Sequence, residues 1–176
     1  MKKLLFLLLI CLSLAGCSSP VDSRLAEADS LLCTGMQEKA FAILKSVSPG
    51  SLHGRGNQAY YALLYTQAQY KCYEPIRSDS LIDIAVNYYD GSGDYDKRLR
   101  SLIYKGAALS DMGDRLEAAD WYKKAEEAAD TVDYDNLGYI NLRLASLYGA
   151  SFIENDEHIT KLKKALDYFH KARNKE

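Results

Sequence analysis

The chain has 176 residues, and its 22 lysines and arginines against 24 aspartates and glutamates give a formal net charge of −2. With no basic excess, the sequence lacks the electrostatic signature of a nucleic-acid-binding protein. It contains only three prolines, which favours helices because proline interrupts them.

The N-terminal segment is the first element along the chain. Lys2 and Lys3 precede an apolar run over residues 4–10 that continues through Leu12, and small residues follow at 15–16. This order predicts a secretory signal peptide. The run is shorter than the roughly 20 residues that a transmembrane helix needs. Residues 14–17 read Leu-Ala-Gly-Cys, which resembles the lipobox of bacterial lipoproteins.

This resemblance implies cleavage before Cys17 and lipid attachment to it. It divides the chain into a signal peptide (1–16), a lipidated cysteine with a short tether (17–21) and a helical repeat domain (22–176). It also implies a lipid-anchored protein of the cell envelope. Ser18 after the cysteine is compatible with outer-membrane sorting and a periplasmic orientation. The alternative is an ordinary signal peptide with a chance cysteine at the cut.

The rest of the chain shows helical periodicity throughout. Apolar spacing and capping residues predict eight helices, at 22–34, 37–47, 54–72, 78–89, 96–111, 114–129, 135–149 and 156–173. The clearest hairpin lies at 99–130, where Gly113 is a helix C-cap and Asp114 with Glu117 forms a capping box. In the last helix, Ile159, Leu162, Ala165, Leu166, Phe169 and Ala172 predict the packed face, and the lysine-rich side predicts a solvated cap.

The same hairpin carries a repeat pattern, Gly106-x2-Leu109-x3-Gly113-x4-Ala118-x3-Tyr122-x2-Ala125. This pattern resembles the tetratricopeptide repeat. Weaker copies surround Ala40, Ala85 and Ala165. The resemblance implies an all-α, right-handed solenoid of about four antiparallel helix pairs, similar to small repeat lipoproteins of Bacteroidales. Gly106 and Ala118 are expected where the two helices cross, because larger side chains would separate them.

Two cysteines remain after the leader and Cys17 are set aside. Cys33 and Cys72 follow equivalent large residues in neighbouring repeats. Equivalent sites on packed helices are about 8–10 Å apart, beyond the roughly 7 Å that a disulfide allows between Cα atoms. We therefore predict free, buried thiols, although the oxidising compartment leaves a disulfide open.

No residue pattern indicates an enzyme, a metal site or a cofactor, and no small-molecule substrate is evident. We expect a non-enzymatic scaffold that binds a protein or peptide in the concave groove of the repeats. The predicted groove residues, all expected to face solvent, are Tyr61, Leu64, Ala68, Lys71, Arg100, Ile103, Ala107, Ser110, Asp111, Tyr139 and Ser146. Alternatives are a component of an outer-membrane or pilus assembly complex, and an enzyme with an unrecognised carboxylate pair.

Overall fold

The protein is helical throughout the described residues. The computed structural model describes residues 20–149 and 156–174, so the predicted signal peptide and Cys17 lie outside them. The described residues form eight α-helices, one short 3-10 helix and no strand. The helices are α2 (Pro20–Cys33), α3 (Gln37–Ser46), α4 (Arg55–Lys71), α5 (Ser80–Tyr89), α6 (Tyr95–Met112), α7 (Arg115–Ala128), α8 (Tyr134–Gly149) and α9 (Asp156–Arg173), with η1 (Pro49–Ser51) between α3 and α4.

The prediction of eight helices is therefore confirmed, and each helix begins and ends within two residues of its predicted bounds. The capping box is also confirmed, because the Asp114 side chain accepts a hydrogen bond from the Glu117 amide at 3.3 Å. Gly113 has a φ of 91°, the left-handed conformation that ends α6. These local signals explain why the hairpin of α6 and α7 could be predicted from the sequence.

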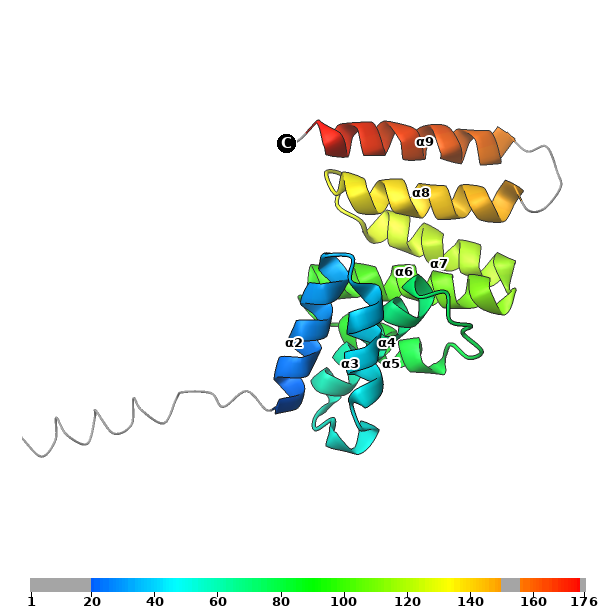
Figure 1. Ribbon diagram of the computed structural model, residues 1–176. Coiled ribbons are helices and arrows are strands. Elements are labelled where there is room, and N and C mark those ends of the chain that lie inside the picture. The colour runs from blue at the N-terminus through cyan, green and yellow to red at the C-terminus, as the bar shows by residue number, and fades with distance from the viewer. Residues whose placement is uncertain (1–19, 150–155, 175–176) are drawn as a thin grey trace, which may run out of the picture.

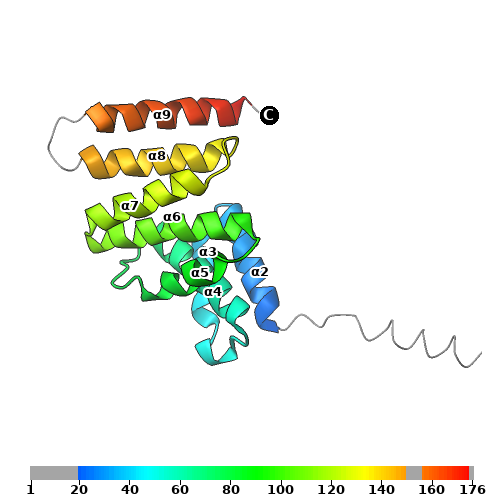
Figure 2. The same cartoon turned by 180° about the vertical axis from the view of Figure 1, so that it is seen from behind.

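Successive helices pack as the pairs α2–α3, α4–α5, α6–α7 and α8–α9, with the two members of each pair running in opposite directions (Figure 1). Each later pair also contacts the one before it. Helix α4 packs on α2 and α3, α6 packs on α4 and α5, and α8 packs on α7. Figure 2 shows the same succession from behind, with α9 and α2 at opposite ends of the described chain.

Two hydrophobic clusters form the core. One joins α2, α3 and part of α4, and the other joins α4 to α8. In the second cluster Gly106 lies against the ring of the fully buried Tyr122, and a Cβ at position 106 would lie 3.1 Å from the ring. Ala118 is fully buried. The close packing predicted at these small residues is thus present between α6 and α7.

The last helix corrects the expectation that its apolar face is packed. Ala165 is buried, but Ile159, Leu162, Leu166 and Phe169 remain exposed. Helix α9 instead meets its neighbours mainly through the adjacent flank, although the Phe169 ring also lies against Gly138 of α8. Lys161 pairs with Glu126 of α7 at 2.6 Å, Tyr168 stacks on Tyr134, and the His158 ring bonds the Ala145 carbonyl at 2.7 Å. Contacts with partly polar residues of α7 and α8 set the orientation of α9 about its axis. The apolar pattern in the sequence of α9 therefore predicted the wrong packed face.

The two cysteines occupy different environments. Both Cys33 and Cys72 are free thiols in the structure. Cys72 is half-buried, and burial raises the pKa of its thiol. Cys33 is exposed at the end of α2, so the prediction that both are buried is wrong for Cys33.

Candidate functional site

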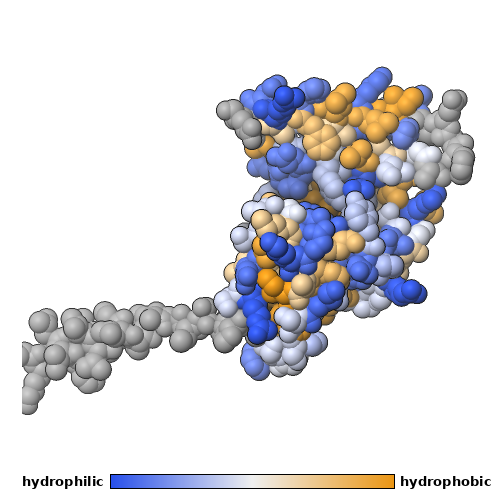
Figure 3. Space-filling view, viewed as in Figure 1, coloured by the Kyte–Doolittle hydropathy of each residue, from blue (hydrophilic) through white to orange (hydrophobic). Residues whose placement is uncertain are grey.

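A groove crosses the face formed by the first helix of each pair, α2, α4, α6 and α8. It consists of two hollows that share Lys71 and Tyr139. The first, of about 600 Å³, is lined by Asp29, Leu32, Cys33, Gln67, Lys71, Asp96, Arg100, Ile103, Tyr104, Asp135, Asn136 and Tyr139. The second, of about 670 Å³, is lined by Gln37, Tyr70, Lys71, Tyr73, Glu74, Asp111, Tyr139 and Arg143. Figure 3 shows a recess on this face, below α8 and α9.

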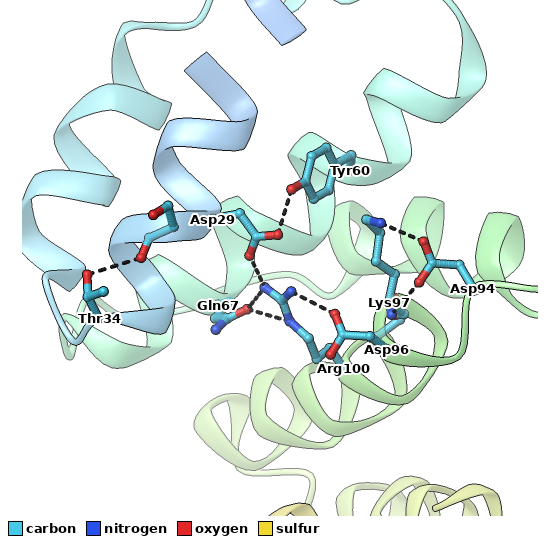
Figure 4. Close-up of polar contacts among 10 residues, drawn as sticks. Asp29, Thr34, Tyr60, Gln67, Asp94, Asp96, Lys97 and Arg100 are labelled. Carbon is cyan, nitrogen blue, oxygen red and sulfur yellow. Dashed lines mark hydrogen bonds and ion pairs between the residues drawn. The ribbon is translucent and has the colours of Figure 1, made fainter. Parts of the chain in front are cut away.

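Arg100 lines the first hollow and is the centre of a polar network (Figure 4). Its guanidinium donates to Asp29 Oδ1 on α2 at 2.7 Å and to Gln67 Oε1 on α4 at 2.6 Å. It also donates to Asp96, one turn earlier on α6, at 3.1 Å. Tyr60 donates to the other oxygen of Asp29 at 2.6 Å. The Arg100 side chain is only 12% exposed, so this network joins three helices in a partly desolvated setting.

The charges in this network stabilise one another. Burial alone raises the pKa of Asp29, but the hydrogen bond and positive charge of Arg100 outweigh it and hold this pKa below its usual value. Burial likewise opposes the charged form of Arg100, and Asp29 and Asp96 more than compensate, which raises its pKa. Arg100 is therefore a permanently charged structural bridge under the first hollow.

Aromatic rings and one arginine form a wall of the second hollow. The ring of Tyr70 meets that of Tyr104, a residue of the first hollow, edge to face, with centroids 6.3 Å apart. The Arg143 guanidinium lies 4.8 Å from the centroid of the Tyr139 ring and 5.7 Å from that of Tyr70. Burial raises the pKa of Tyr139 to about 12, although the charge of Arg143 opposes this shift. Tyr139 therefore stays neutral, and the rings offer flat, rigid surfaces with polar edges.

Two cations of the second hollow have no carboxylate partner. Among the residues that the structure describes, neither Lys71 nor Arg143 forms an ion pair. Lys71 is exposed at the rim, but the walls partly desolvate its ammonium group. This desolvation, together with the positive charge of Arg100, lowers the pKa of Lys71. The second hollow thus presents two cations without ion pairs beside aromatic rings, and the carboxylates of Glu74 and Asp111 line it as well. A ligand carboxylate would be bound at Lys71 and Arg143.

The structure brings together only part of the predicted groove set. Five of its members line the two hollows: Lys71, Arg100, Ile103, Asp111 and Tyr139. Asp111 accepts a hydrogen bond from the Ile76 amide at 2.6 Å and so fixes the loop after α4. Ser110 and Ser146 reach the surface without lining either hollow. The predicted region is right, but the set of side chains in it differs.

Several predicted groove residues are core residues. Leu64 and Ala68 are fully buried in the cluster under α2, and Ala107 is fully buried in the larger cluster, so the expected solvent exposure is wrong for them. Ile103 is also nearly covered. Helix α4 contacts α2 and helix α6 contacts α4 directly, so a residue between the groove and the preceding helix is covered. Tyr61 packs beside Tyr65 at the α3 side and lines neither hollow.

Sequence reasoning missed Asp29, Gln67, Tyr70, Tyr104 and Arg143. Helical spacing could have found two of them. Gln67 lies four residues before Lys71, and Arg143 lies four residues after Tyr139, so each shares a helix face with a predicted groove residue. Nothing in the spacing indicates that Asp29 would reach Arg100 across two helix pairs.

A second charged cluster lies outside the groove. Lys105, almost fully buried, is 2.6 Å from carboxylate oxygens of both Asp79 and Asp83 on or beside α5. Burial disfavours the charged form of Lys105, but the two carboxylates more than compensate and raise its pKa. The lysine offsets one of the two aspartate charges and pairs with both carboxylates, which is the geometry of a structural ion cluster linking α5 to α6. The described residues contain no cluster of metal-ligating side chains.

No known protein family, curated protein or solved structure matches the chain. None of the helices within residues 20–149 and 156–174 has the length and apolar character that crossing a membrane requires.

Proposed function

We propose that the protein is a scaffold that binds a protein or peptide segment in the groove across α2, α4, α6 and α8. The observation that carries this proposal is the second hollow, where Lys71 and Arg143 lack carboxylate partners beside Tyr70 and Tyr139. Aromatic and arginine side chains around a concave surface are the usual anchors of interfaces. The two cations favour a segment that carries acidic side chains.

The helix arrangement supports a repeat scaffold. Four antiparallel pairs follow one another, and the first helix of each later pair packs on the pair before it. We propose that these pairs form a right-handed solenoid of the tetratricopeptide type, in which first helices line the concave side. The predicted small residues at the crossing of α6 and α7, Gly106 and Ala118, agree with that repeat.

The proposed location is the periplasmic face of the outer membrane, through a lipid on Cys17. This part of the proposal depends on the lipobox-like sequence at residues 14–17, which lies outside the described residues. Two or more acyl chains anchor a protein stably. Cys17→Ala should therefore move the protein out of the membrane fraction or leave it unprocessed. If Cys17→Ala is still cut before residue 17 and resists a high-salt wash, the lipoprotein assignment is wrong.

Site-specific crosslinking in intact cells tests the groove. A photoreactive amino acid replaces Lys71, which lines both hollows, and in a matched control it replaces Lys123, an exposed lysine on α7. We expect a defined crosslinked protein from position 71 and none from position 123, with mass spectrometry identifying the partner. Equal adducts at both positions, or no adduct at position 71, would contradict the proposed groove.

A further inference from the structure

Helix α9 has an apolar surface that the described residues leave partly open. We call Ile159, Leu162, Leu166 and Phe169 the α9 stripe; their side chains are 39–59% exposed. Figure 3 shows apolar side chains gathered along α9 on the groove face of the molecule. Leu142 of α8, also exposed, lies on the flank of α8 between its contacts with α9 and the groove residue Tyr139. The stripe and Leu142 thus form one apolar surface over α8 and α9.

Two positions of this surface, those of Leu166 and Phe169, are buried in every earlier pair. The second helix of each pair has a buried alanine, Ala40, Ala85, Ala118 or Ala165, and the next residue in the chain is Phe41, Val86, Ala119 or Leu166. The first three of these next residues are 6%, 9% and 7% exposed, whereas Leu166 is 59% exposed. Four residues after each alanine, Leu44, Tyr89 and Tyr122 are buried, whereas Phe169 is not.

The difference between the pairs is the helix that follows. Helix α4 packs on α3, α6 packs on α5 and α8 packs on α7. No helix in the described chain packs on α9 after α8. The stripe residues are spaced by three, four and three positions, which is the seam spacing with which one helix receives another. At the positions of Leu166 and Phe169, the α9 stripe is therefore a surface that is covered in the earlier pairs.

The outer border of the stripe is cationic. At 100° per residue, Lys163 lies beside the stripe on the side away from α8, and Arg173 extends the seam at its C-terminal end. Both are exposed. Asp156 and Asp167 lie further round the helix. A helix that covers the stripe would meet these two cations, so charge complementarity calls for acidic residues on that flank.

A second copy of the chain fits this surface poorly. Two stripes packed antiparallel would bring the exposed Lys163 side chains of the two copies to the same border, which is unfavourable between like charges. The exposed side of α2, the first helix of another copy, carries Arg24, Glu27 and Ser30 and has no apolar seam to offer. An anionic membrane would match the charge but not the seam spacing, and the equivalent positions in this chain are covered by helices.

We propose that the α9 stripe docks an amphipathic helix of another protein that carries acidic residues along one flank. This surface is separate from the two hollows of the groove, so its occupant does not depend on the proposed groove function.

The test uses a peptide based on the sequence of α8, because α8 covers the equivalent surface of α7. The probe keeps the buried residues of α8 (Leu137, Ile140, Leu144 and Leu147) and carries glutamates along one flank. A matched probe carries lysines there. Binding of each fluorescent peptide to the purified chain is measured by anisotropy. Leu166→Glu is compared with Leu116→Glu, a substitution of a leucine on α7 that is 85% exposed. Circular dichroism melting curves confirm that both variants fold.

We expect the glutamate probe to bind at least about tenfold more tightly than the lysine probe. Leu166→Glu should weaken binding at least about tenfold, and Leu116→Glu should leave it unchanged. Lys71→Glu, in the groove, should also leave it unchanged.

Three outcomes would overturn the proposal. One is that neither probe binds, or that binding survives Leu166→Glu. Another is that the wild-type chain dimerises in sedimentation and Leu166→Glu makes it monomeric, which assigns the stripe to a second copy. The third is that vesicles with about 30% phosphatidylglycerol bind through Leu166 while the glutamate probe does not.

Discussion

The first three helix pairs and the last one use the same repeat position differently. In the earlier pairs the residue after the buried alanine of the second helix, Phe41, Val86 or Ala119, is buried by the following helix. In the last pair Leu166 is exposed at that position. The earlier part is also joined across three helices by Arg100, whereas α9 contacts its neighbours through a partly polar flank.

This contrast shows that the repeat pattern places apolar residues on one face of a helix. Whether that face becomes part of the core depends on whether a neighbouring helix packs on it. An apolar residue at this position stabilises the fold only where it is covered. Stability should therefore be concentrated in α2–α7, and binding surfaces should be found on the groove and on α9. The following changes test that division, from the largest expected effect to the smallest.

The repeat position itself should give the largest difference. Phe41→Ala removes a buried ring that packs edge to face on Tyr65, with centroids 5.2 Å apart. We expect it to lower the free energy of unfolding by about 3–4 kcal/mol. Leu166→Ala at the equivalent exposed position should change it by less than about 1 kcal/mol. Urea denaturation of both variants measures this. Similar losses would mean that α9 is as well covered as α3.

The Arg100 network should come next. Arg100→Met leaves Asp29 and Gln67 without their cationic donor in a partly desolvated site. We expect a loss of about 2–3 kcal/mol, because an unpaired buried charge is costly. The control is Lys123→Met, which breaks an exposed pair with Asp120 and should cost less than about 0.5 kcal/mol. Equal unfolding midpoints for the two variants would show that the network contributes little.

Two close glycine contacts should respond differently to a methyl group. In Gly106→Ala the new methyl group would press on the ring of Tyr122, which is fully buried and has no room to move. We expect about 1 kcal/mol of destabilisation, although alanine has the higher helix propensity. Gly138→Ala presses on Phe169, which lies at the exposed edge of α9 and can turn into water. It should stay within about 0.5 kcal/mol of wild type in thermal unfolding. The reverse order would contradict the division between packed and open regions.

The pH dependence of stability should show the smallest effect. Arg100 and Tyr60 hold the pKa of Asp29 below its usual value of 3.8, despite the opposing effect of burial. A depressed folded-state pKa means that the stabilisation is fully present above the unfolded pKa and is lost as the pH falls through the folded pKa. Wild type should therefore lose more stability than Asp29→Asn between about pH 5 and pH 2. Parallel curves from denaturation at each pH would show that Asp29 is not stabilised by its partners.

Much of the helical framework could be predicted from the sequence, because helix ends are local. Gly113, Asp114 and Glu117 act within one turn of the chain, and the structure shows the expected caps. Surface assignments were less successful, since they depend on neighbours far away in the sequence. Leu64 and Ala68 are covered by α2, and Asp29 meets Arg100 although 71 positions separate them. Helical periodicity gives the faces of a helix but not which neighbour, if any, covers each face.

The central claim is that the groove binds a partner through side chains that the fold itself does not need. Substitution of Lys71 tests this claim most directly, because Lys71 lines both hollows and has no ion pair among the described residues. The measurement pairs the melting temperature of Lys71→Glu with its capture of the partner identified by crosslinking, beside Lys123→Glu as the control. We predict a melting temperature within about 3 °C of wild type, with capture reduced at least about tenfold for Lys71→Glu alone. A normal melting temperature with unchanged capture would contradict the claim.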